Sequence, residues 1–390
     1  MVRKLNYEIK LEVVREGCDR KTEWFQPRAG ILPPKSAVLT VTQSQLGGSD
    51  IFTGLASAWS TDLGLSWSDF TFHLNLARRE ETDGSELVIC DVTPQWHAAS
   101  GKLLATGHTA RYQEGTLVSG QRYTAYTVYQ PETHTWTNWK VLKMPDEKKF
   151  FSCGAGCTQR VDLKNGEILL PVYFLPEEEA ANPWHHCYRS TVLRCCFDGK
   201  SLSYIEHGDE LTVPEPRGLG EPSLTFFQGE FFLTLRNDHQ GYVTRSKDGL
   251  HFQPPIPWKF DDGTPLGSYN TQQHWVTHSE GLYLVYTRRG ANNDHIFRHR
   301  APLFIAEVDP KGLCVLKETE KILVPERGAQ LGNFGSVNVS PKESWVLTSE
   351  GMQGDAKNPY NIQLTFHRGA NNRIYLCRLL WSQPNRLLPW

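Results

Sequence analysis

The sequence lacks two features that would point to a polyanion or a membrane as partner: an excess of positive charge and a long apolar run. Its 41 Lys and Arg are balanced by 43 Asp and Glu, which leaves a formal net charge of −2. Nucleic acid is therefore not expected as a partner. Long apolar runs are also missing: the longest, residues 168–175, is interrupted by Pro171 and is too short to cross a bilayer. No membrane insertion is predicted.

Cysteine spacing gives no sign of a metal site or a disulfide framework. Nine cysteines cannot all pair, Cys195 and Cys196 are adjacent, and the spacings match no zinc pattern. Reduced, buried thiols are the expectation, and neither a metal nor another cofactor is predicted. The first residues lack the apolar stretch of a signal peptide. The compartment stays open: the chain is cytoplasmic as given, or secreted or periplasmic if a signal was removed.

Long amphipathic helical patterns are scarce, and short alternating runs dominate instead. Gly, Pro, Asn and Asp separate these runs, which is typical of an all-β chain whose strands are joined by tight turns. The clearest runs cover residues 37–42, 86–92, 166–173, 223–235, 281–287 and 344–349. Because no linker or change of composition divides the chain, a single domain over residues 1–390 is predicted.

One turn motif occurs twice, as S-T-D-L-G-L-S-W at residues 60–67 and as S-K-D-G-L-H-F at residues 246–252. Its Asp accepts hydrogen bonds from backbone N–H groups that follow it, and its Gly supplies a positive φ. The closing aromatic ring buries and anchors the hairpin. Two copies, each after an alternating run, resemble the Asp-box of sialidases (neuraminidases) and related BNR-repeat β-propellers.

This resemblance implies an all-β, sialidase-like fold built from repeated blades. Weaker versions of the turn fall at residues 129–136 and 196–202, and a further turn lies near residues 308–313. A repeat of roughly 60 residues predicts a six-bladed β-propeller with about four antiparallel strands in each blade. A last strand near residues 373–381 is expected to close the ring against N-terminal residues.

The segment G-L-G-E-P-S-L-T-F-F-Q-G-E-F-F-L-T-L-R-N, residues 218–237, carries the most specific chemical signal. It resembles the sialidase stretch in which a Glu opens one inner strand and an Arg ends the next. On that resemblance Glu221 is the active-site Glu and Arg236 binds the substrate carboxylate. The residues support this independently, because a Glu and an Arg at matching ends of a hairpin can face one cavity. The alternative is an ordinary surface ion pair.

Two further arginines resemble the other carboxylate-binding residues of the family. Arg300 leads into the apolar run A-P-L-F-I-A, with Arg298 as the fallback if the register differs. Arg28, in Q-P-R-A-G-I-L-P, stands where the family has an Arg-Ile-Pro motif, here two residues longer. Three converging guanidinium groups would hold a carboxylate through bidentate hydrogen bonds. The alternative is three separate structural salt bridges.

The resemblance also implies a catalytic acid and a nucleophile. Asp50 follows G-G-S ahead of the first Asp-box, where the family has its acid, and would protonate the leaving oxygen. It is otherwise a turn Asp that caps its own loop. Sialidases use a Tyr nucleophile, which avoids the repulsion between an anionic nucleophile and the substrate carboxylate. The matching segment here, G-N-F-G-S-V at residues 332–337, has Phe334 instead, and it leads on to Glu350, which is expected to contact substrate.

A polar segment before another strand offers replacements for the missing Tyr. It contains Tyr269 as a migrated nucleophile, Gln273 as a substrate ligand and His274 as a catalytic group, or it is simply a decorated blade edge. His97 is a further candidate for contact with substrate. The histidines His295 and His299 are four residues apart, but strand or loop context argues against a metal pair there.

The resemblance therefore implies an exo-acting glycoside hydrolase of the sialidase superfamily, acting on a terminal acidic sugar such as sialic acid. Asp50 would be the acid and Glu221 the base, toward Tyr269 or directly toward water. Two alternatives remain: a rhamnosidase or polysaccharide lyase acting at a uronic acid through a His, or a non-catalytic carbohydrate-binding propeller. An acidic oligosaccharide or polysaccharide is the expected partner in each case, and fold alone does not decide between them.

Overall fold

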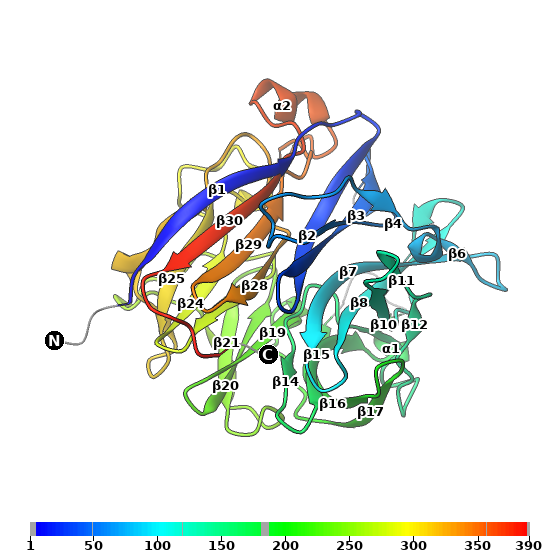
Figure 1. Cartoon of the computed structure of the whole chain (residues 1–390), viewed down its shortest axis with the longest axis horizontal. Helices are drawn as coiled ribbons and strands as arrows, with labels where there is room; N and C mark the ends of the chain where they lie inside the picture. Colours follow the sequence, from blue (N-terminus) through cyan, green and yellow to red (C-terminus); the bar gives the residue numbers. More distant parts are fainter. Residues whose placement is uncertain (1–4, 49, 119, 181–186, 356, 388–390) are drawn as a thin grey trace.

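The computed structural model describes residues 5–48, 50–118, 120–180, 187–355 and 357–387 (Figure 1). Of the described residues, 51% are in strands and 5% in helices, as the alternating sequence pattern predicts. Within these residues the strands form six sheets that follow one another along the chain. None of the described helices is long and apolar enough to span a membrane.

The first three sheets are formed by the N-terminal half of the chain. The first contains β2 (Thr22–Leu32), β3 (Ser36–Gln45), β4 (Phe52–Ser60) and β5 (Thr71–Phe72). The second contains β6 (Arg79–Glu80), β7 (Glu86–His97), β8 (Lys102–Gln113), β9 (Thr116–Leu117), β10 (Thr124–Gln130), β11 (Thr135–Trp136) and β12 (Lys140–Val141). The third contains β13 (Ser152–Gly154), β14 (Val161–Asp162), β15 (Glu167–Leu175), β16 (Cys187–Phe197), β17 (Leu202–His207) and β18 (Arg217–Gly218).

The other three sheets follow in the same order. The fourth contains β19 (Gly220–Phe227), β20 (Glu230–Arg236), β21 (Tyr242–Ser246) and β22 (Ile256–Pro257). The fifth contains β23 (His274–His278), β24 (Gly281–Tyr286), β25 (Leu303–Asp309), β26 (Cys314–Val315) and β27 (Lys321–Val324). The last contains β28 (Phe334–Ser340), β29 (Glu343–Ser349), β30 (Ile374–Trp381) and β1 (Tyr7–Arg15). The short helices are α1 (Glu177–Ala180) and α2 (Ile362–His367), with 3-10 turns η1 (Leu74–Leu76), η2 (Phe297–His299) and η3 (Lys317–Thr319).

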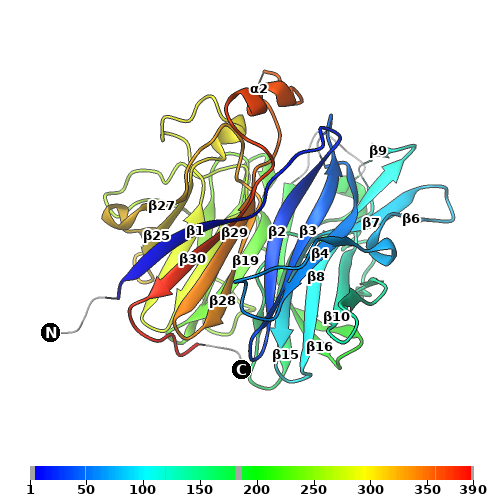
Figure 2. The same cartoon turned by 45° about the horizontal axis from the view of Figure 1, so that its top comes forward.

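The two ends of the chain meet in the last sheet. Strand β1 pairs antiparallel with β30, and Tyr7 lies opposite Trp381. Figures 1 and 2 both show β1, in blue, beside β30, in red. This pairing confirms the prediction that a strand near residues 373–381 closes against the N-terminal residues.

Apolar side chains join each sheet to the next. One buried cluster connects the first and second sheets, through residues such as Leu55 and Ile89. Equivalent clusters join the following pairs of sheets, and another, which includes Leu39 and Leu376, joins the last sheet to the first. Burial of this apolar surface is the main favourable term that holds the sheets together. The chain is therefore an all-β propeller of antiparallel, largely four-stranded sheets.

Both turn motifs form the hydrogen bonds that their residue types predict. In the first, Asp62 Oδ1 accepts from the Ser60 hydroxyl at 2.8 Å and from the Ser66 N–H at 2.9 Å. In the second, Asp248 Oδ1 accepts from the Ser246 hydroxyl at 2.9 Å. The motifs follow β4 and β21, the third strands of their sheets. They stabilise the outer hairpins and lie away from the innermost strands.

Candidate functional site

The inner ends of the sheets enclose a polar cavity of about 380 Å³. Its wall combines acidic and basic side chains from loops and strands that are far apart in the sequence. Among the lining residues are Asp50, Asp91, Glu221, Arg236, Arg298 and Arg300. Such a concave site with a few convergent charged groups is the usual form of a small-ligand pocket.

Successive sheets supply the cavity with residues in the left-handed backbone conformation. Gln26, Asp91, Cys157 and Glu221 have φ between 43° and 59°, and all four line the cavity. Three of them stand at register shifts of an inner strand, in β2, β7 and β19. A β-bulge redirects a side chain, and non-glycine residues in this conformation carry strain of about 1–3 kcal/mol each. The strain is concentrated where the fold needs polar groups to face the cavity.

Glu221 and Arg236 meet in this cavity, as the hairpin argument predicts. Gly220 lies opposite Arg236 in the β19–β20 register, and Arg236 Nη1 donates to Glu221 Oε1. Arg236 Nη2 also donates to Asp238 Oδ1 at 3.1 Å and to Asn270 Oδ1 at 2.8 Å. The Arg236 charge is thus compensated by two carboxylates of the protein.

Arg300 differs from Arg236 because it is held by neutral groups. Its Nε donates to the Asn270 carbonyl at 3.1 Å and its Nη1 to Gln330 Oε1 at 3.2 Å. Burial, together with the charges of Arg236 and Arg298, lowers the pKa of Arg300 to about 9. Among the described residues no carboxylate forms an ion pair with Arg300 or Arg298. This side of the cavity therefore favours an incoming anion.

Arg28 does not reach the cavity wall, contrary to the prediction of a direct contact with substrate. Only 1% of the residue is exposed, and its Nη1 lies 3.5 Å from Asp91 Oδ1. The side chain packs on Gly335, where an added Cβ would come within 2.6 Å of Arg28 Cγ. Arg28 therefore compensates the charge of Asp91 from a buried position and not from the cavity surface. Arg298, the fallback residue, does line the cavity together with Arg236 and Arg300, and Arg111, Arg122 and Arg217 line it as well.

Asp50 lies at the open side of the cavity. It lines the wall and is exposed, and its backbone is left-handed with φ of 58°. Its carbonyl accepts a hydrogen bond from the Tyr112 hydroxyl, which positions the loop. A carboxyl group at this place can reach both solvent and a bound ligand.

Tyr269, Gln273 and His274 do not line this cavity, so their predicted contact with substrate is not supported. Tyr269 bonds His299 Nδ1 at 2.5 Å and stacks on Arg289. The Gln273 amide is satisfied internally, by Ser268 and Thr234 among others. His274 is buried, and its Nδ1 lies 2.8 Å from Ser223 Oγ. The described hydrogen bonds of these three side chains are therefore made to other residues around the segment and in the neighbouring sheet.

Glu350 and His97 are also structural. Glu350 is 1% exposed and accepts hydrogen bonds from the backbone N–H and guanidinium of Arg373 and from the Tyr375 hydroxyl. His97 is equally buried and bonds Ser100 Oγ at 2.7 Å and the Gly166 carbonyl at 2.9 Å. Neither residue lines the cavity.

Phe334 is the first residue of β28 and is completely buried. Its ring meets the edge of His274, with ring centroids 5.2 Å apart, and belongs to the cluster between the last two sheets. The position that the sialidase resemblance assigns to the nucleophile is thus occupied by a core side chain.

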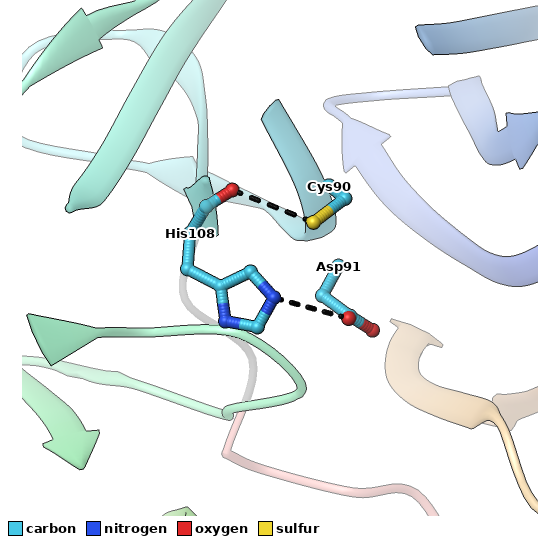
Figure 3. Close-up of side chains that lie close together, drawn as sticks. All are labelled: Cys90, Asp91 and His108. Carbon is cyan, nitrogen blue, oxygen red and sulfur yellow. Dashed lines mark hydrogen bonds and ion pairs between the residues drawn. The ribbon is translucent and has the colours of Figure 1, made fainter. Parts of the chain in front are cut away.

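A chain of three residues that the sequence did not reveal also lines the cavity. Asp91 Oδ2 lies 3.4 Å from His108 Nε2 (Figure 3), and His108 Nδ1 lies 3.3 Å from the Tyr173 hydroxyl. Burial opposes ionisation of Asp91, but the hydrogen bond and charge of His108 and the charge of Arg28 hold its pKa at about 2. Burial lowers the pKa of His108, against the effect of Asp91. Asp91 is therefore ionised and His108 neutral at pH 7.

Cys90 completes a compact group with Asp91 and His108, whose potential ligand atoms lie within 4.8 Å of one another (Figure 3). Its thiol donates to the His108 carbonyl at 3.7 Å and packs in an apolar cluster with Phe25 and Tyr112. Burial raises the pKa of Cys90 well above its usual range. Since a metal requires the thiolate, this environment does not favour a metal ligand.

Comparison with known proteins supports the fold alone. No family model and no curated protein matches the sequence. A Dyadobacter fermentans protein of unknown function is similar in structure, with a TM-score of 0.60, 14% identity and coverage of 97% of this chain and 100% of that one. The Trypanosoma rangeli sialidase in complex with sialic acid has a TM-score of 0.59 and 11% identity over 97% of this chain and 59% of its own. The Hadza microbial sialidase Hz136 has a TM-score of 0.63 and 10% identity, over 96% of this chain and 68% of its own.

This chain thus spans less than two thirds of the length of the Trypanosoma rangeli enzyme. At 10–14% identity these similarities concern the backbone arrangement and do not extend to the reaction. They show that the chain has a sialidase-like propeller fold.

Proposed function

We propose that the protein is an exo-acting glycoside hydrolase whose substrate ends in a carboxylated sugar, sialic acid or a related acidic sugar. The observation that carries the proposal is the guanidinium corner formed by Arg236, Arg298 and Arg300. Its charge exceeds that of its protein partners, because Arg300 bonds only to neutral groups. A buried cation without a counter-ion is stabilised when an anion binds.

A carboxylate is the anion that fits this corner best. Arginine presents two parallel N–H groups, which match the two oxygens of a carboxylate. Gly332 makes room for Arg300, because a Cβ at this position would lie 2.3 Å from Arg300 Cδ. In this proposal Arg300 and Arg298 grip the substrate carboxylate, and Arg236 adds a third contact while it holds Glu221.

The acidic groups around this corner provide the proton transfers. Asp50, exposed at the open side, acts as the acid that protonates the leaving glycosidic oxygen. Glu221, held by Arg236, lines the same cavity and acts as the base. The leaving part of the glycan then points to solvent, as an exo-acting enzyme requires.

We further propose that the sheets are six blades of a closed propeller. Support comes from the apolar clusters, which join each sheet to the next and the last to the first. The pairing of β1 with β30 closes the last blade. In such a ring the inner strands converge on one axis, where the cavity lies.

The test is release of the aglycone from a panel of fluorogenic glycosides of sialic acid, other keto-acid sugars, glucuronic acid and neutral sugars. Cleavage restricted to acidic sugars is expected. Arg300→Gln should weaken binding of the acidic sugar, measured by calorimetry, roughly 10- to 100-fold, the loss of a charged hydrogen-bonding pair. The control is Arg245→Gln, on β21 outside the cavity, which should bind normally.

Other outcomes assign other functions. Ultraviolet absorbance from an unsaturated uronate would identify a polysaccharide lyase, and binding without turnover would identify a carbohydrate-binding propeller. Preference for neutral glycosides, or equal binding by the Arg300→Gln variant, would refute the role of the guanidinium corner.

A further inference from the structure

Tyr173 is the cavity-lining tyrosine whose hydroxyl faces a histidine. It lies on β15 opposite Gly154, and its hydroxyl oxygen is 3.3 Å from His108 Nδ1. Its ring meets the wall that Glu221 and Arg236 also line. Phe334, by contrast, presents no hydroxyl to the cavity.

The direction of the hydrogen bonds follows from the charge states. His108 is neutral, so one ring nitrogen carries a proton and the other accepts. Asp91 is ionised and faces Nε2 at 3.4 Å, which places the proton on Nε2. Nδ1 is then the acceptor, and the Tyr173 hydroxyl donates to it. A nucleophile, a base and a group that orients the base are thereby connected in sequence.

The backbone around His108 is built to hold this arrangement. A Cβ at Gly154 would lie 2.5 Å from His108 Cβ, and one at Gly156 would lie 2.3 Å from His108 Nδ1. Asp91 is held in a left-handed conformation that aims its carboxylate at the imidazole, and Cys157 Sγ donates to its other oxygen at 2.7 Å. These contacts restrict the imidazole to one position between two partners.

One cation, Arg122, lies where its charge would stabilise a tyrosinate at Tyr173 as it forms. Arg122 is half-buried, and its guanidinium lies 5.1 Å from the centroid of the Tyr173 ring. Its Nη1 is buried and has no hydrogen-bond partner in the described structure. Burial raises the pKa of Tyr173, and the charge of Arg122 opposes this effect. The hydroxyl therefore stays protonated at rest and gives up its proton only to a base in contact with it.

We propose that Tyr173 is the nucleophile of the glycosidase, that His108 is its base, and that Asp91 is a positioning residue that holds the imidazole. This inference rests on the proposed function. It also assigns Glu221 a supporting electrostatic role in place of the base role proposed above, since His108 contacts the hydroxyl directly.

The reaction would proceed in two displacements. In the first, the Tyr173 oxygen forms a bond to the anomeric carbon while the bond from that carbon to the leaving oxygen breaks. The phenolic proton passes to His108 Nδ1, and protonated Asp50 gives its proton to the leaving oxygen. In the second, water attacks the anomeric carbon, its proton passes to Asp50, and Tyr173 leaves and recovers its proton from His108. Two inversions give net retention at the anomeric carbon.

The first experiment compares Tyr173→Phe with Tyr204→Phe. Tyr204 is a matched control, because its hydroxyl also bonds a His Nδ1, that of His207 at 2.7 Å, but at the outer strand β17 of the same sheet. Tyr173→Phe should lower kcat by on the order of 10³-fold or more while the Kd for the acidic sugar changes little. Tyr204→Phe should leave both kcat and the Kd for the acidic sugar unchanged.

The second experiment traps the intermediate on the wild-type protein, so it does not depend on the folding of a variant. The probe is an acidic glycosyl fluoride with a second fluorine next to the anomeric carbon, which slows the second displacement. Peptide mapping should place the adduct on Tyr173. An adduct on another residue, or Tyr173→Phe activity within about threefold of wild type, would overturn the assignment of Tyr173 as nucleophile. The proposed glycosidase function would remain supported in either case.

The positioning role of Asp91 is tested by the pH profile. Asp91→Asn removes the charge that stabilises the His108 imidazolium, so the acid limb of kcat/KM should move to lower pH as the rate falls about 10²- to 10⁴-fold. A lower rate without a shift of that limb would indicate a purely structural role and would overturn the assignment of Asp91 as a positioning residue. If the wild-type protein neither binds nor cleaves any acidic sugar, the proposed function fails, and the inference fails with it.

Discussion

Replacement of Glu23 by Gln should stabilise the protein at neutral pH and leave it unchanged at acidic pH. Glu23 lies on β2 and is buried, with 6% of its surface exposed. Its carboxylate accepts the Met352 N–H at 2.6 Å, and no ion pair involves it among the described residues. Burial, with a smaller contribution from the charge of Asp50, raises its pKa from 4.5 to about 7.

The magnitude follows from that shift. Folding favours the protonated carboxyl, so stability is complete below pH 4.5, falls as the pH rises toward 7, and stays low above it. A pKa of about 7 against 4.5 in the unfolded chain corresponds to roughly 3 kcal/mol. Glutamine keeps the shape and the acceptor but does not ionise. The free energy of unfolding of Glu23→Gln should therefore exceed that of wild type by about 3 kcal/mol at pH 8 and match it at pH 4.

The assay is urea unfolding followed by tryptophan fluorescence at both pH values. Glu350→Gln is the matched contrast, because Glu350 is equally buried but bonded to Arg373 and Tyr375. Loss of its charge should destabilise the protein by about 2–4 kcal/mol at pH 8. A Glu23→Gln variant that is less stable than wild type at pH 8 would show that the Glu23 carboxylate has a stabilising partner, and would refute the reasoning.

Three further substitutions test the cavity and the turns. Gly332→Ala should displace Arg300, whose Cδ would lie 2.3 Å from the new Cβ, and should weaken carboxylate binding in calorimetry while the Kd for neutral sugars stays unchanged. Phe334→Tyr places a hydroxyl in a fully buried apolar cluster, so it should cost about 1–3 kcal/mol in urea unfolding and produce no gain in glycosidase rate. Ser246→Ala removes a hydroxyl that donates to Asp248 and accepts a backbone N–H, and should lower the free energy of unfolding by about 1 kcal/mol.

Local patterns in the sequence predicted much of the fold. The alternating runs correspond to strands such as β3, β15 and β29, and the two turn motifs have the hydrogen bonds that their residues dictate. The pairing of Glu221 with Arg236 was also predictable, because both residues belong to one hairpin and a hairpin fixes its own register. These predictions depend on contacts between residues that are close along the chain.

Contacts between sheets were not predictable in the same way. Arg28 is buried and does not line the cavity, because β2 also packs against β7 and β28. These strands bring Asp91 and Gly335 to its side chain. The polar segment with Tyr269 and His274 has the residue types of a site, yet Tyr269 bonds His299 and His274 bonds Ser223 of the neighbouring sheet. A polar residue in a strand gives no indication of whether its partner is a substrate or the neighbouring sheet.

The sequence by itself determined the strand content, the turns and the charged hairpin of the cavity, because each depends on short-range geometry. Only the tertiary structure decided which guanidinium groups of the described cavity wall form no ion pair, and that Asp91, His108 and Tyr173 form one chain. Those three residues come from two different sheets, on β7, β8 and β15. Their contact arises when apolar burial draws the sheets around a common axis, and no local pattern records where that axis falls.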